Sequence, residues 1–171
     1  MLAATLCQFA RADVVFLVDS SRSICGGDTE CSNWRSILNF VISIVNQLNI
    51  GSENTRVGFI RYSSRTTTSN EFYLNSNQFD RNQVTNAISA IRYNTGSTFV
   101  GDLANAFQVA RTQQFVSNRG ERIGAEDIII VLMNGGVSAT SSAVSTQSII
   151  TVPQVFIVFI CLLYSHIIHC I

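Results

Sequence analysis

The sequence is informative first for what it lacks. Among its 171 residues there is no lysine, and its eleven arginines balance eleven acidic residues, so the formal net charge is zero. A chain without excess positive charge has no attractive field for nucleic acid, and this composition gives no reason to expect a strongly acidic partner. There is also no Asn-x-Ser/Thr sequon, so glycosylation offers no information about the cellular compartment.

Motifs of several enzyme classes are missing as well. The sequence contains neither Gly-x-Ser-x-Gly nor His-Glu-x-x-His, which mark a serine nucleophile and a zinc protease site. Gly96–Gly101 has the glycine spacing of a phosphate-binding loop, but Asp102 follows where that loop needs lysine, and its charge would repel phosphate. The two histidines lie near the C-terminus beside two cysteines, in a spacing unlike that of zinc fingers. We therefore predict that the protein is not an enzyme.

Charged side chains are absent from residues 128–171. Within this part, Gln154–Ile160 is rich in valine, isoleucine and phenylalanine, which favours a fifth sheet strand. Alternatively, residues 149–171 are long and apolar enough for a membrane helix, although Pro153 fits poorly in one. We favour the strand, and we expect a membrane as a partner only if residues 149–171 are helical. Residues 161–171 form an apolar tail without an assignment.

The five cysteines bear on the compartment. Cys25 and Cys31 flank a Gly-Gly-Asp-Thr-Glu loop that a local disulfide could close, and such a bridge would indicate an oxidising, extracellular setting. Two free thiols in a reducing compartment are the alternative. The odd number leaves at least one cysteine without an internal partner, and Cys7 could pair with a residue outside this chain. Residues 1–11 are expected to be the remnant of a signal peptide or of a linker.

The most informative stretch is a short apolar run followed by oxygen-bearing side chains. Val14–Val18 is rich in valine, as in strands buried on both faces of a parallel sheet. Asp19, Ser21 and Ser23 follow at the carboxyl end of this strand, where open α/β sheets bind ligands. Mg²⁺ prefers oxygen ligands and usually takes only one or two carboxylates. The pattern predicts half of a metal site, although the two serines could instead only turn the chain towards a helix.

Apolar periodicity divides the chain into alternating strands and helices, which predicts an α/β fold with a mainly parallel sheet. The two most apolar strands, Val14–Val18 and Ile128–Met133, should be central neighbours. Arg56, Arg61 and Arg65 are expected on a solvated strand face and loop. The other expected elements are strands Thr55–Tyr62 and Glu71–Leu74 (at an edge), helices capped by Ser32 and Asp80, and a helix with Leu103, Phe107 and Ala110 facing inward.

This order of parts resembles the von Willebrand factor type A domain, also called the integrin I domain. The metal-ion-dependent adhesion site (MIDAS) of that family begins with Asp-x-Ser-x-Ser after the first strand, which matches Asp19, Ser21 and Ser23. A threonine in the family's Gly-Gly-Thr-x-Thr-Gly loop corresponds to Thr98. The last ligand of the family is the aspartate of a Thr-Asp-Gly turn, and here that position is Asn134.

The resemblance implies a Rossmann-like, mainly parallel sheet flanked by helices, with one short antiparallel edge strand, over residues 12–160. The sequence offers no counterpart of the family's sixth strand and last helix, so we expect both to be missing. The amide of Asn134 brings no charge and leaves Asp19 as the only carboxylate ligand. We therefore expect weak binding of Mg²⁺ or Mn²⁺; the alternative is a site that has lost its cation.

In this family, an acidic side chain of the bound protein completes the coordination of the metal. The resemblance thus implies a secreted or cell-surface module for cell adhesion or for binding an extracellular protein such as a matrix component. The alternative is a cation-independent structural module of a multidomain matrix or membrane protein. Sensitivity of partner binding to a chelator distinguishes these two functions.

Overall fold

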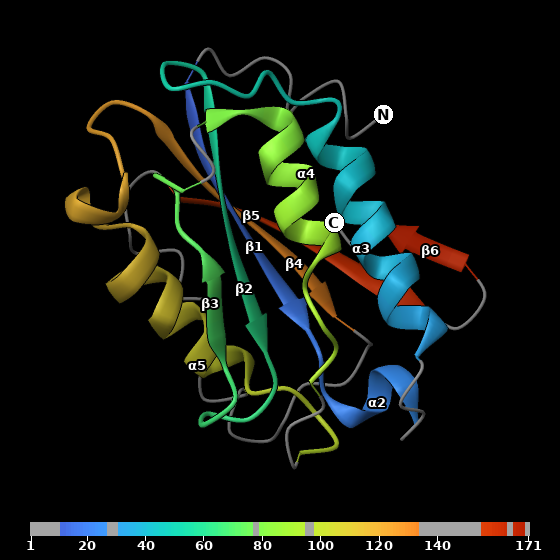
Figure 1. Ribbon diagram of the computed structural model, residues 1–171. Coiled ribbons are helices and arrows are strands. Elements are labelled where there is room, and N and C mark those ends of the chain that lie inside the picture. Colours follow the sequence, from blue (N-terminus) through green and yellow to red (C-terminus); the bar gives the residue numbers. More distant parts are fainter. Residues whose placement is uncertain are drawn as a thin grey trace.

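A computed structural model shows one sheet with helices on both faces (Figure 1). It describes residues 11–26, 31–76, 79–94 and 98–133 in full, and the backbone of residues 155–163 and 166–169. The strands are β1 (Ala12–Asp19), β2 (Thr55–Tyr62), β3 (Ser69–Phe72), β4 (Glu126–Met133), β5 (Val155–Leu163) and β6 (His166–His169). The helices are α2 (Arg22–Cys25), α3 (Ser32–Val45), α4 (Arg81–Ser89) and α5 (Leu103–Val109), followed by a π-helical turn η2 (Ala110–Gln114) and a 3-10 turn η3 (Ser117–Arg119).

Strand β1 lies inside the sheet, whose order is β3-β2-β1-β4-β5-β6. It pairs in parallel with β2 on one side and with β4 on the other, while β3 pairs antiparallel with β2 at one edge. The predicted α/β class, the mainly parallel sheet, the antiparallel edge strand and the pairing of the two most apolar strands are confirmed. Because β1, β2 and β4 are parallel, their carboxyl ends meet at one end of the sheet, the lower end in Figure 1.

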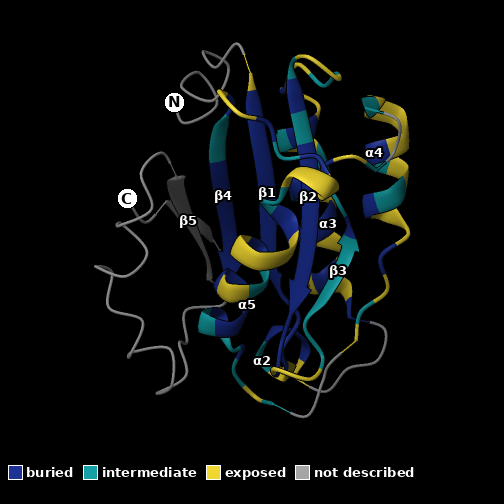
Figure 2. Ribbon diagram, turned by 90° about the vertical axis from the view of Figure 1, so that its left-hand side faces the viewer, coloured by how far each residue is buried: buried dark blue, intermediate teal, exposed yellow. Residues whose placement is uncertain are grey.

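Burial on both faces explains the apolar run of β1, all of whose residues are buried. Val14, Phe16 and Val18 pack with α3 and α4 in one apolar core, whereas Val15 and Leu17 pack with α5 in the other. Figure 2 shows the buried strands β1, β2 and β4 between α5 and α3. Helices thus cover the centre of the sheet on both sides, as parallel strands require.

The helices begin close to the predicted positions. Asp80 caps α4, as predicted, and its carboxylate accepts the backbone N–H of Gln83 at 3.0 Å. The cap of α3 is Cys31 rather than Ser32, because the sulfur of Cys31 accepts the backbone N–H of Trp34 at 3.2 Å. The buried residues of α3 recur at three- and four-residue spacing and form its core face: Trp34, Ile37, Leu38, Val41 and Val45.

The edge strand β3 begins two residues earlier than predicted and ends at Phe72, its one buried residue. A short edge strand with a single buried side chain carries little periodic pattern, which explains the shift. Arg61 of β2 is buried and not on a solvated face as expected: its Nε donates to Glu71 Oε1 at 2.9 Å. The ion pair fixes β3 to β2.

The C-terminal strands extend the other side of the sheet. Residues 155–163 form β5, which pairs in parallel with β4, so the strand interpretation holds for this part of the tail. Within the described part of the chain, no helix is long and apolar enough to cross a membrane. The prediction of a missing sixth strand is wrong in one respect, because β6 pairs antiparallel with β5. An antiparallel neighbour needs no crossover helix, which is why the apolar tail could supply it.

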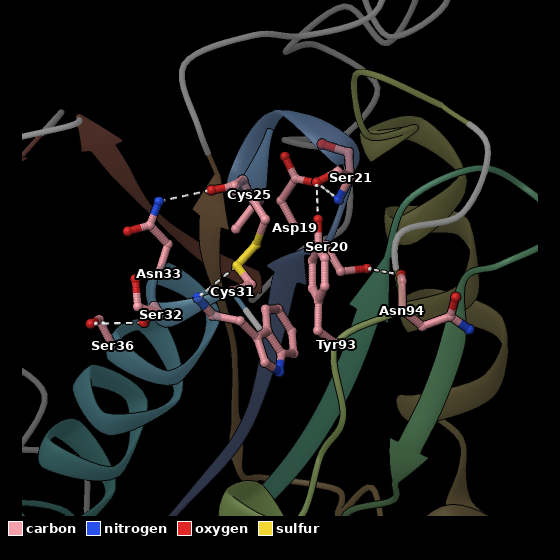
Figure 3. Close-up of a disulfide and its surroundings, with 12 residues drawn as sticks. Asp19, Ser20, Ser21, Cys25, Cys31, Ser32, Asn33, Ser36, Tyr93 and Asn94 are labelled. Atoms are coloured by element: carbon pink, nitrogen blue, oxygen red, sulfur yellow. Dashed lines mark hydrogen bonds between the residues drawn. A yellow bond between two sulfur atoms is a disulfide. The ribbon is translucent and has the colours of Figure 1, made fainter. Parts of the chain in front are cut away.

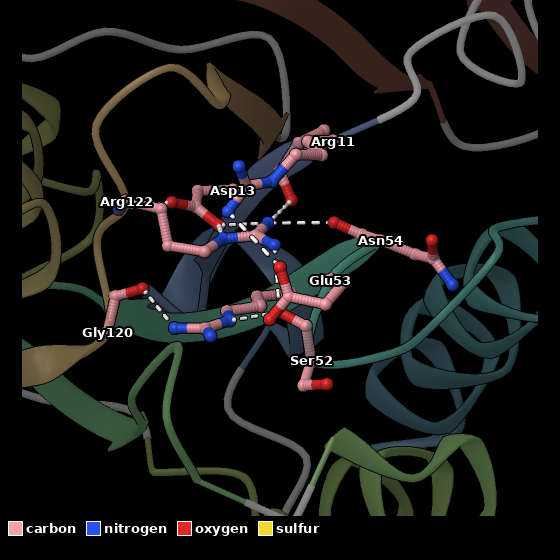
Figure 4. Close-up of polar contacts among 9 residues, drawn as sticks. Arg11, Asp13, Ser52, Glu53, Asn54, Gly120 and Arg122 are labelled. Carbon is pink, nitrogen blue, oxygen red and sulfur yellow. Dashed lines mark hydrogen bonds and ion pairs between the residues drawn. The ribbon is translucent and has the colours of Figure 1, made fainter.

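A buried ion pair fixes the amino end of the sheet (Figure 4). Asp13 of β1 is fully buried, and Nη2 of the buried Arg122 lies 2.7 Å from its Oδ1. The backbone N–H of Arg122 donates to Asp13 Oδ2 at 2.8 Å. The guanidinium also donates to the backbone carbonyls of Ala12, Ser52 and Asn54. The pair therefore joins β1 to the segments that precede β2 and β4.

Asp127, opposite Asp13 in the β1–β4 register, carries a charge that folding disfavours. Its Oδ1 is buried and has no hydrogen-bond partner among the described residues. Burial, together with the charges of Asp13, Glu121 and Glu126, raises the pKa of Asp127 from 3.8 to about 7. Because the folded pKa lies above the unfolded value, stability should be highest with Asp127 protonated and should fall as pH rises from about 4 to about 7.

Asp127→Asn is expected to remove this fall. At about pH 8 the variant should be more stable than the native protein by about 1–3 kcal/mol, and the two should converge near pH 4. Urea denaturation across this pH range measures both effects. Glu53→Gln, at an exposed position, serves as the control and should follow the native profile. A native-like pH profile for Asp127→Asn would contradict the prediction.

Candidate metal-binding site

Asp19 lies at the carboxyl end of β1, where the chain turns into α2. Its side chain is buried, and its Oδ1 accepts the backbone N–H of Ser21 at 2.8 Å. The hydroxyls of Ser21 and Ser23 share a hydrogen bond of 2.9 Å. One carboxylate and two hydroxyls are therefore gathered within one turn that begins where the strand ends.

A second loop brings Thr98 to this turn. The backbone N–H of Arg22 donates to Thr98 O and that of Ser23 donates to Phe99 O, both at 3.1 Å. The Thr98 hydroxyl lies 3.2 Å from the hydroxyl of Ser63, the residue after β2. The loops that carry the predicted ligands are thus in direct contact, although they are distant in sequence. The remaining predicted ligand, Asn134, lies outside the described residues.

Three residues outside the predicted set of ligands support the turn: Ser20, Ser63 and Tyr93. The Ser20 hydroxyl is within 3.2 Å of two backbone carbonyls, those of Tyr62 and Asn94. The Tyr93 hydroxyl donates to Ser21 O at 3.0 Å. Burial and the charge of Asp19 raise the pKa of Tyr93, which keeps this phenol protonated as a donor. Ser63 could have been found, because it follows a buried strand as Ser20 does; Tyr93 carries no comparable signal.

Gly101 allows the second loop to pack this closely. A Cβ at this position would lie 2.6 Å from the Tyr62 ring and 2.9 Å from Asp19 Oδ1, so a larger residue would displace the carboxylate or the ring. The next residue, Asp102, donates its backbone N–H to Ser63 O at 2.6 Å. Its carboxylate caps α5 by accepting the Asn105 N–H at 3.0 Å. The start of α5 is therefore anchored to the site.

The disulfide between Cys25 and Cys31 joins the end of α2 to the start of α3, beside the turn (Figure 3). This is the pairing that the sequence analysis favoured. Trp34, on the first turn of α3, packs against the Tyr93 ring with a centroid distance of 5.7 Å, and its Nε1 donates to Ile91 O at 3.0 Å. Because Tyr93 also bonds to the Ser21 carbonyl, α2 is held at its end by the disulfide and just before its start by Tyr93.

Replacing both cysteines of this disulfide by serine is expected to cost about 2 kcal/mol of unfolding free energy, because the unfolded chain gains the freedom of a short loop. Denaturation in urea with and without a reducing agent measures the cost. The reducing agent should destabilise the native protein but leave the Cys25→Ser, Cys31→Ser variant unchanged. Identical midpoints for the native protein in both conditions would refute the prediction.

The four described candidate ligands provide one carboxylate and three hydroxyl oxygens: Asp19, Ser21, Ser23 and Thr98. Such a donor set suits a hard divalent ion that retains several of its waters, as Mg²⁺ and Mn²⁺ do. Over the described ranges, there is no group of three or more His, Cys, Asp or Glu residues that could hold a metal. The chemistry of the donors therefore fits the predicted ion, with a low negative charge.

Comparison with known proteins places these features in a family. The sequence matches the von Willebrand factor type A domain over residues 13–159. It is 30% identical to the human (Homo sapiens) collagen alpha-5(VI) chain over 129 residues and 33% identical to mouse (Mus musculus) matrilin-2 over 128 residues. These alignments cover 75% and 74% of this chain but only 4% and 12% of the two relatives. The chain thus spans a small part of the length of each.

Solved structures share the fold. Proximal thread matrix protein 1 from the mussel byssus, solved with zinc in its MIDAS motif, matches with a TM-score of 0.73 and 20% identity, over 90% of this chain and 36% of that one. At this level of identity the likeness concerns the fold alone. The family match covers most of the chain, and the sheet order, the turn after β1 and the adjoining threonine loop agree with it. The chain belongs to the von Willebrand factor type A domain family.

Proposed function

We propose that the domain is a non-enzymatic module for cell adhesion or matrix binding that uses a weak divalent-cation site. Asp19, Ser21, Ser23, Thr98 and Asn134 would hold Mg²⁺ or Mn²⁺. The ion would supply a positive centre for an acidic side chain of an extracellular partner. The domain is extracellular, as are the collagen and matrilin relatives, and the Cys25–Cys31 disulfide suits that setting.

The contact between the two loops carries this proposal. The backbone bonds from Arg22 and Ser23 to the loop of Thr98 hold hydroxyls from both loops near the buried carboxylate of Asp19. A loop whose serines only turned the chain into α2 would not need Thr98 beside it. The same hydroxyls are hydrogen-bonded in pairs, Ser21 with Ser23 and Thr98 with Ser63, so an ion has to compete with these bonds.

The expected affinity is low because one charge is missing. Asp19 is the one carboxylate among the proposed ligands, and an amide at position 134 adds no negative charge. In a partly buried site the loss of one charge weakens divalent binding by a few kcal/mol. A carboxylate from the partner would restore the missing negative charge, so we expect the affinity for the ion to rise when the partner binds.

Calorimetric titration with Mg²⁺ and with Mn²⁺ tests the proposal. The native protein should bind Mn²⁺ weakly and should melt at a higher temperature with the ion than with a chelator. Asn134→Asp should bind both ions more tightly. If the native protein gives no heat and no thermal shift while Asn134→Asp gives both, the site has lost its cation. The domain would then act as a cation-independent structural module.

A further inference from the structure

An exposed aromatic side chain lies next to the candidate site. Phe99 is 68% exposed and follows Thr98 directly, and Ile123 is the other exposed large apolar residue of the described ranges, at 96%. Ile123 lies before β4, at the amino end of the sheet, whereas Phe99 lies at the carboxyl end with Asp19. Exposed aromatic side chains near a polar site are a recurrent feature of protein-binding surfaces. Phe99 is therefore placed to contact whatever approaches the ion.

The backbone of Phe99 is fixed to the turn that carries the candidate ligands. Its carbonyl accepts the Ser23 N–H and the preceding carbonyl accepts the Arg22 N–H, both at 3.1 Å. On the other side, Gly101 packs against Asp19 and the Tyr62 ring. Because the backbone of this segment is already held at both ends, binding of a partner requires little further ordering of the loop, and the contact of Phe99 can contribute directly to affinity.

The positively charged Arg22 lies in the same turn. Arg22 is exposed and is the first residue of α2, and its own N–H makes one of the bonds to the Thr98 loop. Arg22 and Phe99 are thus exposed residues on two loops that backbone hydrogen bonds join beside the hydroxyl cluster.

We propose that Phe99 and Arg22 form a recognition rim that selects the residues beside the partner's metal-binding carboxylate. The partner is a protein segment in which an acidic residue is flanked by a large apolar side chain, which packs on Phe99, and by a second acidic side chain, which pairs with Arg22. This inference rests on the proposed function. Apolar contact and a charge-assisted hydrogen bond are the matching interactions.

A protein segment fits this rim better than an anionic membrane does. Adsorption to anionic lipid takes a cluster of several basic residues. The chain has no lysine and a net charge of zero. One arginine and one exposed aromatic residue on adjoining loops offer too little positive charge for anionic lipid but suit the side chains of a peptide.

A peptide array tests the rim. Each spot carries a peptide whose central glutamate is flanked by phenylalanine, leucine, serine or aspartate. A second array carries the same peptides with glutamine at the centre. The native protein, with Mn²⁺, should bind glutamate flanked by an apolar and an acidic residue about tenfold better than glutamate flanked by serine. Phe99→Ala should lose the preference for an apolar flanking residue, and Arg22→Gln should lose the preference for an acidic flanking residue. Both variants should keep the preference for a central glutamate over glutamine and should bind Mn²⁺ as the native protein does. Ile123→Ala and Arg35→Gln, at exposed positions on other elements, should keep all preferences.

Two sets of results would overturn the rim alone. In the first, Mn²⁺ binding and the preference for glutamate are present, but flanking residues have no effect or keep their effect in Phe99→Ala. In the second, the native protein binds phosphatidylserine vesicles, loses this binding in Phe99→Ala and Arg22→Gln, and shows no flanking preference on the array. Absence of both Mn²⁺ binding and the preference for glutamate would instead overturn the proposed function, and the rim with it.

Discussion

Replacing Asp19 by alanine is expected to abolish binding of Mg²⁺ and Mn²⁺. Asp19 is the one carboxylate among the proposed ligands, and hydroxyls and waters alone do not hold a divalent ion against bulk water. Its Oδ1 also accepts the Ser21 N–H at 2.8 Å, so alanine would release the turn as well. Isothermal calorimetry and the thermal shift with Mn²⁺ should both show no binding.

Two further variants separate charge from structure. Asp19→Asn keeps an oxygen that can accept the Ser21 N–H but removes the charge, so it should fold like the native protein and still fail to bind Mn²⁺. Asp80→Asn is the matched control, because Asp80 also accepts one backbone N–H, at 3.0 Å, but at the cap of α4. It should bind Mn²⁺ as the native protein does. Native affinity in Asp19→Asn would show that the ion binds elsewhere.

Of the substitutions considered for stability, Arg122→Ala should cause the largest loss of unfolding free energy. It would leave the carboxylate of Asp13 fully buried without its cation and would remove the donors to three backbone carbonyls. Breaking one side of a buried ion pair costs about 3–5 kcal/mol. Equilibrium denaturation in urea should show this loss as a lower midpoint.

The surface pair of Arg11 and Glu53 provides the control for Arg122. Their atoms lie 3.5 Å apart, with 43% and 75% of the side chains exposed. Arg11→Ala should therefore cost less than about 1 kcal/mol. Adding Asp13→Asn to Arg122→Ala should recover part of the lost stability, because it removes the uncompensated charge. Equal losses in Arg11→Ala and Arg122→Ala would contradict the assigned role of burial.

The centre of the fold could be predicted because its signals are local. The bounds of β2 are those predicted, and the apolar runs Val14–Val18 and Ile128–Met133 lie within β1 and β4. An apolar run or a capping aspartate depends on neighbours in sequence, so neither requires knowledge of the fold. The Cys31 cap of α3 was missed because a cysteine is not a usual cap.

Long-range polar contacts could not be predicted. Arg122 and Asp13 are separated by 109 positions, and the residues around each give no indication that the other is its partner. The burial of Arg61 depends on Glu71 of another strand, and a pattern of alternating side chains says nothing about such a partner. The four residues of β6, His-Ile-Ile-His, are too few to show a strand periodicity.

The sequence predicts the ligand residues of the candidate site, whereas the contacts between them are known only from the structure. Asp19, Ser21 and Ser23 followed from the strand end, and Thr98 from the family resemblance; the contact between their loops is visible only in three dimensions. Tyr93 was missed because it acts on a backbone carbonyl, which any residue possesses. Asn134 stays a prediction, as does the domain extent of residues 12–160.

The position of β1 within the sheet has a consequence for amide hydrogen exchange. Its backbone is paired on both sides, by β2 and by β4, so fraying of β3 or β6 at the edges leaves its hydrogen bonds intact. The amides of β1 should exchange only through global opening, and they should be the slowest in the domain. The turn at Asp19 is thus attached to the segment that unfolds last. Local unfolding at either edge of the sheet should therefore leave the proposed ligands of this turn in place.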